Sequence, residues 1–439
     1  MILRDLKTVA AFAVAVILAP GAETSSAQQV PGNSITLNAN GGWCWFQDER
    51  AVVDEGRIVF GSVASPSGDV TVTTYDVASG KSVVVTLHAG LGSDDHNTPA
   101  LLILPDGRYL AVYSRHGADR LMRWRLSTKP HDASSWEPER TVDVGAGMTY
   151  SNLFRLSMEN NRIYNFHRGR GYDPSYMVSE DAGATWSYGG HLLANANDPK
   201  NRIRPYLKYA SNNTDAVHFI ASEAHPQESS ATSIYHGYLK GGKVYRSDGT
   251  LVGSLSDGPV EPTNLTRVFA GDAKNKAWTS DIHLDGDGRP YIAYSVHKSS
   301  EDHRYRYARW DGTRWHDFEI SFGGRRLYRG EEHYTGNIAL DPNDPDTVYV
   351  SADVDPSNGQ PLRSSADGLR HYELFKGTTP DHGRSWAWTP LTKNSSMDNI
   401  RPVVPVWNKR QTAILWLRGS YRSYTDYDLE VVGIVVRDR

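Results

Sequence analysis

The residues best suited to chemistry are histidines and arginines next to short apolar runs. His96 stands directly before one such run, and His116 directly follows the next one. A neutral imidazole near its ordinary pKa can accept a proton, and a guanidinium can hold a carboxylate through two hydrogen bonds. Together, these two residue types would suit proton abstraction beside a carboxylate, provided that the fold brings them to one place.

The apolar runs repeat along the chain, and this repetition predicts the fold. One unit recurs seven times, with a polar opening, an alternating apolar run, a turn and a second apolar strand. The openings lie at Trp45, Asp95, Tyr150, Arg202, Trp278, His333 and Asn399. Spacings of about 50–75 residues suit four-stranded blades, none of which can bury both faces alone. We therefore predict an all-β, seven-bladed β-propeller, in which strands near Ser34–Asn38 and Leu429–Val436 share the closing blade.

A propeller would gather polar residues around one opening. Within each blade the first strand begins on the same face of the disc to which the second strand returns. His96 and His116 belong to one blade and should therefore be neighbours. The other residues expected around this mouth are Asn97, Tyr150, Asn152, His167, Arg168, Arg202, Arg204, His225, Asp281, His333 and Arg401.

Two hairpins carry a recognisable turn motif. Residues Ser179–Trp186 and Thr379–Trp386 both fit the pattern Ser/Thr-x-Asp-x-Gly-x-Thr/Ser-Trp, the Asp box. The aspartate can accept hydrogen bonds from the turn, the glycine can take a backbone angle that other residues avoid, and the tryptophan can pack between blades. The motif is structural, and it favours a sialidase-like propeller without specifying its chemistry.

The first residues predict export. A short positively charged start precedes an apolar run from Val9 to Ala19, and small residues lead to Ala27. This pattern is typical of a cleavable signal peptide over residues 1–27, which leaves residues 28–439 as one propeller domain in a secreted or periplasmic protein. The apolar run is too short to span a bilayer comfortably, so no membrane partner is expected.

Composition narrows the partners further. The formal charge of −4 argues against nucleic acid, and a site for an anionic polymer would have to concentrate arginines locally. The single cysteine, Cys44, lies in the aromatic run Trp43–Phe46 and should be buried. Without a disulfide, a large core must stabilise the fold, and we expect a monomer.

Several runs of the chain resemble a known family. They include Gly41-Gly-Trp-Cys-Trp-Phe-Gln-Asp48, Asp94-Asp-His-Asn-Thr-Pro-Ala, Ser114-Arg-His, Arg204-Pro-Tyr, Asp302-His-Arg-Tyr-Arg-Tyr-Ala-Arg-Trp and Arg418-Gly-Ser-Tyr-Arg-Ser-Tyr-Thr-Asp-Tyr-Asp. These runs, which span nearly the whole mature chain, resemble the BNR-repeat-containing propellers that include ulvan lyases. The resemblance implies a site with a histidine pair, a tyrosine and an arginine. His96 and His116 correspond to the pair, Arg204 to the arginine and Tyr188 to the tyrosine, with Tyr150 or Tyr172 as alternatives.

The resemblance implies a polysaccharide lyase that cleaves an anionic, uronic-acid-containing polysaccharide such as ulvan by β-elimination. Arg204 would neutralise the uronate carboxylate, and Tyr188 would protonate the leaving oxygen. Either His96 or His116 could remove the proton at C5. The residues predicted to bind substrate are Asn97, Tyr150, Asn152, Arg168, His225 and Arg401.

Two other functions stay open at this point. A glycoside hydrolase would need two carboxylates, or a tyrosine nucleophile helped by an acid, and a sialidase would need an arginine triad. The candidates are Asp94, Asp95 and Asp281 for the carboxylates, and Arg204, Arg401 and Arg418 for the triad. A non-catalytic carbohydrate-binding propeller is the third interpretation.

The predicted elimination requires no cofactor. Histidines and acids spread over the later blades leave a structural zinc or calcium site open, but no tight ligand spacing assigns one.

Overall fold

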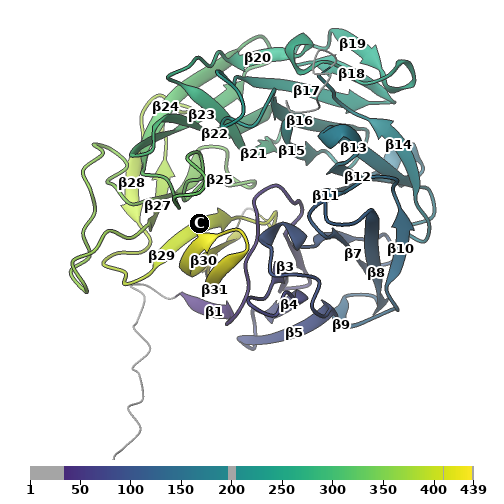
Figure 1. Ribbon diagram of the computed structural model, residues 1–439, viewed down its shortest axis with the longest axis horizontal. Helices are drawn as coiled ribbons and strands as arrows, with labels where there is room; N and C mark the ends of the chain where they lie inside the picture. The colour runs from purple at the N-terminus through teal and green to yellow at the C-terminus, as the bar shows by residue number, and fades with distance from the viewer. Residues whose placement is uncertain (1–33, 196–203, 409, 438–439) are drawn as a thin grey trace, which may run out of the picture.

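The computed structural model describes residues 34–195, 204–408 and 410–437, whose strands form a ring of seven sheets (Figure 1). The predicted signal peptide at residues 1–27 lies outside the described residues. The helical segments in the described ranges are short 3-10 turns, namely η1 (Asp95–Asn97), η2 (Ser157–Glu159), η3 (Arg170–Tyr172), η4 (Leu255–Asp257) and η5 (Pro262–Asn264). None of the helices in these ranges is long and apolar enough to cross a membrane. The predicted all-β, seven-bladed propeller is confirmed.

The first four blades follow one another around the ring, and each is given from its innermost strand outward. The first consists of β2 (Ala51–Asp54), β3 (Arg57–Val63), β4 (Val70–Asp76) and β5 (Lys81–His88). The second consists of β6 (Ala100–Ile103), β7 (Tyr109–Ser114), β8 (Leu121–Lys129) and β10 (Arg140–Asp143), with β9 (Asp132–Trp136) also paired to β8. The third consists of β11 (Thr149–Leu156), β12 (Arg162–Arg168), β13 (Pro174–Ser179) and β14 (Ser187–His191). The fourth consists of β15 (Tyr206–Ser211), β16 (Ala216–Ser222), β17 (Ile234–Lys240), β18 (Lys243–Arg246) and β19 (Leu251–Ser254), with β20 (Thr266–Phe269) paired to β17.

The remaining three blades complete the ring. The fifth consists of β21 (Lys276–Leu284), β22 (Pro290–Ser299), β23 (Asp302–Trp310) and β24 (Trp315–Gly324). The sixth consists of β25 (Ile338–Leu340), β26 (Thr347–Ala352), β27 (Glu373–Thr378) and β28 (Ala387–Pro390). The seventh consists of β29 (Asp398–Val403), β30 (Gln411–Ser423), β31 (Asp426–Arg437) and, as its outermost strand, β1 (Ile35–Asn38).

The two ends of the chain close the ring in the seventh blade. Strand β1 pairs antiparallel with β31, with Ile35 opposite Gly433 (Figure 1). The predicted sharing of the closing blade is therefore confirmed. Because the outermost strand comes from one end and the three inner strands from the other, unfolding either end removes part of the same sheet.

An aromatic segment fills the centre of the disc. The ring of Trp45 lies 5.0 Å from that of Trp278 and 4.9 Å from that of Tyr334. The neighbouring Phe46 packs at 5.1–5.2 Å against the rings of Tyr150 and Tyr206. These partners belong to four different blades, so the segment before the first blade joins the inner strands into one core. The rings of Trp45 and Phe46 and their partners therefore fill the centre of the disc.

Three of the innermost strands, β11, β21 and β29, carry β-bulges. The register shifts in β11 between Thr149 and Asn152, and in β29 between Ile400 and Val403. Within these bulges Tyr150 and Arg401 adopt left-handed backbone angles, with φ of 66° and 52°. Such a conformation costs a non-glycine residue on the order of 1–3 kcal/mol and turns its side chain away from the regular direction. Both side chains belong to the site described next.

Candidate active site

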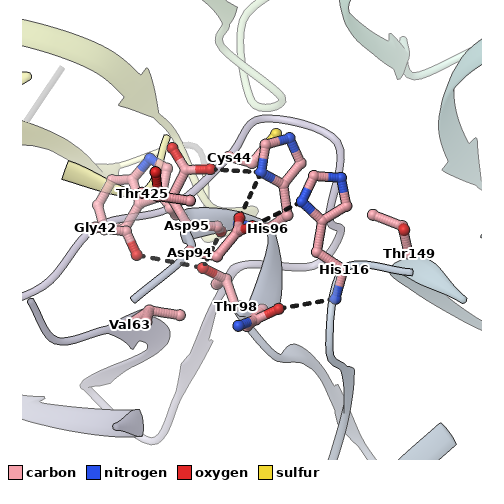
Figure 2. A network of polar contacts seen from close by, with 12 residues as sticks. Gly42, Cys44, Val63, Asp94, Asp95, His96, Thr98, His116, Thr149 and Thr425 are labelled. Atoms are coloured by element: carbon pink, nitrogen blue, oxygen red, sulfur yellow. Dashed lines mark hydrogen bonds and ion pairs between the residues drawn. The ribbon is translucent and has the colours of Figure 1, made fainter. Parts of the chain in front are cut away.

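The centre of the site is the carboxylate of Asp94, which binds both histidines. Its Oδ1 lies 2.8 Å from Nδ1 of His96, and its Oδ2 lies 2.7 Å from Nδ1 of His116. The imidazole rings stack with centroids 4.1 Å apart and an angle of 15° (Figure 2). The two histidines are neighbours, as predicted from their position in one blade. Asp94, which lies between the first and second blades, joins them.

The backbone around the histidines is held by side chains of the same segment. Asp94 caps η1 by accepting the backbone N–H of His96 at 2.9 Å. Asn97 accepts the backbone N–H of His116 at 2.9 Å and donates to the carbonyl of Gly92 at 3.0 Å. Asn97 is buried, so in this structure it ties the turn after β7 to η1 and stands behind the histidines rather than at the surface.

The buried guanidinium of Arg168 at the end of β12 completes the arrangement. It donates to the hydroxyl of Tyr206 at 2.9 Å and to Oγ1 of Thr149 at 3.3 Å, and its Nη2 lies 3.2 Å from Nε2 of His116. The side chain is 9% exposed. Its hydrogen-bond partners are all uncharged, and among the described residues no carboxylate lies within ion-pair distance. A buried positive charge without an anion is costly unless a ligand supplies one.

The contact with Arg168 fixes the tautomer of His116. Arginine only donates hydrogen bonds, so Nε2 of His116 accepts, and its Nδ1–H donates to Asp94. Burial, and after it the positive charge of His96, lower the pKa of His116 to about 4. The imidazole is therefore neutral at pH 7, and 22% of the side chain is exposed. His116 thus keeps an unprotonated Nε2, which accepts from Arg168 at 3.2 Å.

His96 has the opposite charge state. Burial lowers its pKa, but neighbouring groups outweigh burial and raise the pKa well above its ordinary value. Nδ1 of His96 lies 2.8 Å from the carboxylate of Asp94 and 2.9 Å from that of Asp95, and these two negative charges favour the protonated ring. The side chain is 4% exposed. His96 is therefore a buried, charged imidazole, and it shares the carboxylate of Asp94 with the neutral imidazole of His116.

A buried ion pair between Asp95 and Arg401 lies next to His96, and it changes the role expected for Arg401. Asp95 accepts from Arg401 and, at 2.7 Å, from the hydroxyl of Tyr421, while its Oδ1 lies 2.9 Å from Nδ1 of His96. Arg401 also donates to the carbonyl of Trp43 and is 1% exposed. The prediction that Arg401 contacts substrate needs correction, because its guanidinium is enclosed. The side chain instead fixes the seventh blade to the segment that carries the histidines.

The hydroxyls of Tyr150 and Tyr206 lie at Nη1 of Arg168, whereas His116 lies at Nη2. The ring of Tyr150 lies 5.5 Å from that of His96, and its hydroxyl lies 3.5 Å from Nη1 of Arg168. Burial is the main cause that raises the pKa of Tyr150, so its hydroxyl keeps its proton at neutral pH. Tyr150, Arg168 and Tyr206 also line a small cavity between the third and fourth blades. A hydroxyl that can donate a proton thus lies beside the guanidinium.

Tyr188 is not part of this arrangement. It lies on β14, the outermost strand of the third blade, where the guanidinium of Arg170 lies 4.3 Å over its ring. Its hydroxyl is buried without a hydrogen-bond partner. The fourth strand of a blade lies at the rim of the disc, so Tyr188 has no contact with the histidine pair. The alternative Tyr172 is half exposed and also has no contact with the pair, which leaves Tyr150 as the tyrosine that the structure places at the site.

Arg204 lies near the mouth but is already neutralised. Its Nε donates to Oε2 of Glu228 at 3.1 Å, and its guanidinium lies 5.6 Å from the ring centre of Tyr172. Arg202, expected beside it, lies outside the described residues. The arginine without a carboxylate at the histidines is Arg168, from the second strand of the preceding blade. The sequence places Arg168 and Arg204 in similar positions. The structure shows that they differ, because Arg204 pairs with a carboxylate and Arg168 does not among the described residues.

His225 and Asn152 lie at the borders of the site. The ring of His225 lies 5.3 Å from that of Tyr206, and burial, followed by Arg204 and Arg168, lowers its pKa to about 3. His225 is therefore a neutral group at the edge of the mouth. Asn152 is 1% exposed and donates to the carbonyl of Phe166 at 3.1 Å, which makes it a support of β11.

Sequence reasoning missed Asp94 as the link between the histidines and did not name Tyr206 or Tyr424. The ring of Tyr424, from the turn between β30 and β31, lies 5.1 Å from His96 and 5.6 Å from His116. The sequence Asp94-Asp95-His96 places two carboxylates next to an imidazole, and this is the one signal that could have indicated the contact. No spacing links Tyr424 to the second blade, because the contact arises from ring closure.

Two groups of metal-ligating side chains overlap with the site. The ligand atoms of Cys44, Asp95 and His96, and those of Asp94, His96 and His116, lie within 4.8 Å of one another among the described residues. In both groups the carboxylates already accept from cationic or imidazole groups. A metal would have to compete with these donors, so the donor sets do not favour one. A structural zinc or calcium ion elsewhere stays a prediction.

Comparison with known proteins points in the same direction as the geometry. The family model described as "BNR repeat-containing family member" matches residues 60–322. The fold is similar to an ulvan lyase of polysaccharide lyase family PL25, solved bound to -[GlcA(1-4)Rha3S]-, with a TM-score of 0.66 and 16% identity over 92% of this chain and 95% of that one. It is also similar to the polysaccharide lyase Uly1, with a TM-score of 0.57 and 12% identity over 89% and 90% of the two chains. No curated protein sequence matches.

Proposed function

Because the chain belongs to the BNR repeat-containing family, and because a neutral histidine lies beside a buried arginine that has no carboxylate partner among the described residues, we propose that it is a polysaccharide lyase. Its substrate would be an anionic polysaccharide that contains uronic acid, such as ulvan. The observation that carries this proposal is the environment of Arg168. A guanidinium enclosed with hydroxyls and a neutral imidazole suits one carboxylate from a ligand, bound through two hydrogen bonds.

The proposed reaction begins with removal of the proton at C5 of the uronate by Nε2 of His116. The electron pair of the C5–H bond forms the C4–C5 double bond, and the bond from C4 to the leaving oxygen breaks. Arg168 stabilises the charge that develops on the carboxylate during this step. Nη2 of Arg168 donates to Nε2 of His116 at 3.2 Å, and a substrate carboxylate bound by Arg168 would take over this N–H and leave Nε2 free to accept the adjacent C5 proton.

Tyr150 is the proposed proton donor to the leaving oxygen. Its raised pKa keeps the hydroxyl protonated, and its position beside Arg168 places it next to the same sugar. The phenolate that remains regains a proton from the medium, as His116 loses the one it took. In this assignment Arg168 takes the role that the resemblance implies for Arg204, and Tyr150 takes that of Tyr188.

The environment of the acidic residues supports elimination over hydrolysis. A hydrolase of the usual kind needs two free carboxyl groups on either side of the bond. Asp94 is engaged by two imidazoles and Asp95 by Arg401 and Tyr421. Asp281, the third candidate, is partly buried and accepts the backbone N–H of Leu340 at 2.9 Å.

The test is cleavage of ulvan and other uronate polymers, followed by the ultraviolet absorbance of the unsaturated sugar end. We expect this absorbance to rise with the wild-type protein. His116→Ala should lower the rate by about 10²–10⁴-fold, the usual contribution of a general base. New reducing ends without the absorbance would instead indicate hydrolysis, and retention of the polymer without any cleavage would indicate a binding propeller.

We further propose that the protein acts outside the cytoplasm, because residues 1–27 have the charge and apolar pattern expected of a cleavable signal peptide. Mass spectrometry of the exported protein should find its first residue at Gln28. An intact N-terminus on a cytoplasmic protein would contradict this proposal.

A further inference from the structure

The mouth that holds His116 has a second polar edge, formed by His225 and Glu331. His225 follows β16, the second strand of the fourth blade, and Glu331 lies in the segment between β24 and β25. Second strands end, and first strands begin, on the face of the disc where the histidine pair lies. Both side chains therefore belong to that face, although the whole fifth blade separates them in the sequence.

This edge adjoins Arg168 through one tyrosine. The ring of His225 lies 5.3 Å from that of Tyr206, whose hydroxyl accepts from Arg168 at 2.9 Å. Arg168 is the group that binds the uronate carboxylate in the proposed function. A group bound between His225 and Glu331 would therefore belong to that uronate or to the sugar next to it.

His225 offers a hydrogen-bond donor. Nδ1 of its ring accepts the backbone N–H of Gln227 at 3.1 Å. Burial, followed by the charges of Arg204 and Arg168, lowers the pKa of His225 to about 3, so the ring is neutral at pH 7 and carries one proton. Because Nδ1 accepts, this proton lies on Nε2. Oε2 of Glu331 is 3.8 Å from Nε2, which is too far for a hydrogen bond.

Glu331 offers the matching acceptor. Its side chain is 24% exposed, and its Oε2 is buried without a hydrogen-bond partner among the described residues. The nearby Arg204 is already paired with Glu228. Burial, and after it the charge of Glu228, raise the pKa of Glu331. A carboxylate beside a site for an anionic polymer repels this polymer, so its presence is unfavourable unless it makes a specific contact.

The two facing atoms fit one hydroxyl group. They are 3.8 Å apart, and a hydroxyl oxygen can lie about 2.8 Å from both at once, because twice that distance exceeds their separation. Such a hydroxyl would accept from Nε2–H of His225 and donate to the carboxylate of Glu331. A sulfate oxygen fits poorly, because it has no proton to donate and its charge has the same sign as that of Glu331.

We propose that His225 and Glu331 together bind a free hydroxyl group of the polysaccharide, and that Glu331 excludes a sulfate ester from this position. This inference rests on the proposed function, because it takes the ligand of the mouth to be an acidic polysaccharide. It adds a selection by sulfation pattern. A polymer whose sulfate groups lie away from this hydroxyl is accepted, and one that is sulfated there is rejected.

The test compares ulvan oligosaccharides with the same oligosaccharides after chemical oversulfation, through the rate at which unsaturated ends form. Glu331→Ala should raise KM for the native oligosaccharides about tenfold or more, as expected for one hydrogen bond to a charged group, and should leave kcat nearly unchanged. Glu331→Gln keeps an acceptor but loses the charge. It should retain most of the native affinity, and its preference for native over oversulfated substrate should fall at least about threefold.

The control variant is Glu332→Gln, which makes the same change at the neighbouring residue. Glu332 pairs with Arg326 rather than with His225, so this variant should match the wild-type protein on both substrates. An unchanged KM in Glu331→Ala, an unchanged preference in Glu331→Gln, or equal effects in Glu332→Gln would overturn the proposal. If Glu331→Ala melts at a lower temperature than the wild-type protein, the preference of Glu331→Gln decides.

Calorimetric titration with the native oligosaccharides separates this inference from the proposed function. If the wild-type protein binds them without cleaving them, and Glu331→Ala weakens this binding, the proposed lyase activity fails and the hydroxyl site stands. If the wild-type protein cleaves them and Glu331→Ala binds and cleaves them equally well, the lyase activity stands and the hydroxyl site fails. If it neither binds nor cleaves them, both proposals fail.

Discussion

The charge of His96 should control the pH dependence of the reaction through His116. The pKa of His116 is about 4, so kcat/KM should fall as the pH drops through about 4 and the base becomes protonated. The substitution His96→Asn removes the neighbouring charge. The amide of asparagine can still donate to Asp94 in place of imidazole Nδ1–H, so the carboxylate keeps its orientation.

The size of the shift follows from the geometry of the pair. The two rings are 4.1 Å apart, and two unit charges at about 4 Å interact by about 4 kcal/mol at an effective dielectric constant of about 20. This energy corresponds to about 3 pKa units. Because 22% of His116 is exposed, solvent screens part of the interaction, and we expect the acid limb to move up by about 1–2 pH units.

The assay is the pH profile of kcat/KM on a soluble uronate polymer, measured for the wild-type protein and His96→Asn. The control is His371→Asn, because His371 is also a protonated histidine, with a pKa raised to about 9 by Asp398 and Asp367, but it lies outside the site. Its profile should match that of the wild-type protein. An acid limb near pH 6.5 in the wild-type protein, or an unmoved limb in His96→Asn, would refute the assignment of charge to the two histidines.

Three further predictions concern residues whose roles the structure separates. Tyr150→Phe should lower kcat by about 10²–10⁴-fold while Tyr188→Phe keeps wild-type kinetics; equal effects would contradict the assignment of the proton donor. Arg401→Met should destabilise the fold by about 3–5 kcal/mol in urea unfolding, because Asp95 would keep a buried charge without its partner, and a change below about 1 kcal/mol would argue against a tight pair. The folded pKa of His371 is raised, so its ion pairs stabilise the protein fully below the unfolded pKa near 6.5 and lose this effect as the pH rises through about 9. His371→Ala should therefore lower the melting temperature at pH 6 but not at pH 10.

The architecture could be predicted because it rests on a local pattern. Each blade repeats the same order of apolar strand, turn and apolar strand, and a single blade cannot bury both faces, so the number of repeats predicts the closed ring. Ring closure through β1 and β31 follows from the same count. His96 and His116 could also be paired, because they lie at the two rim ends of one hairpin, where antiparallel geometry makes them neighbours.

The partners of this pair could not be predicted in the same way. Arg168 and Arg204 both stand at strand ends facing the mouth. Only the structure shows that Glu228 neutralises Arg204, whereas no carboxylate in the described part of the chain reaches Arg168. The same holds for Arg401, whose enclosure by Asp95 depends on a bulge in β29.

Strand order, blade number and the histidine pair can thus be derived from the residues alone, because they depend on contacts between neighbours in one hairpin or one repeat. The identity of the base, the free arginine and the tyrosine depends on burial and charge contributed by distant segments. The ring of Tyr424 lies 5.1 Å from that of His96, although the two residues are more than three hundred positions apart in the chain. This contact forms only when the ring closes, because it joins the seventh blade to the second.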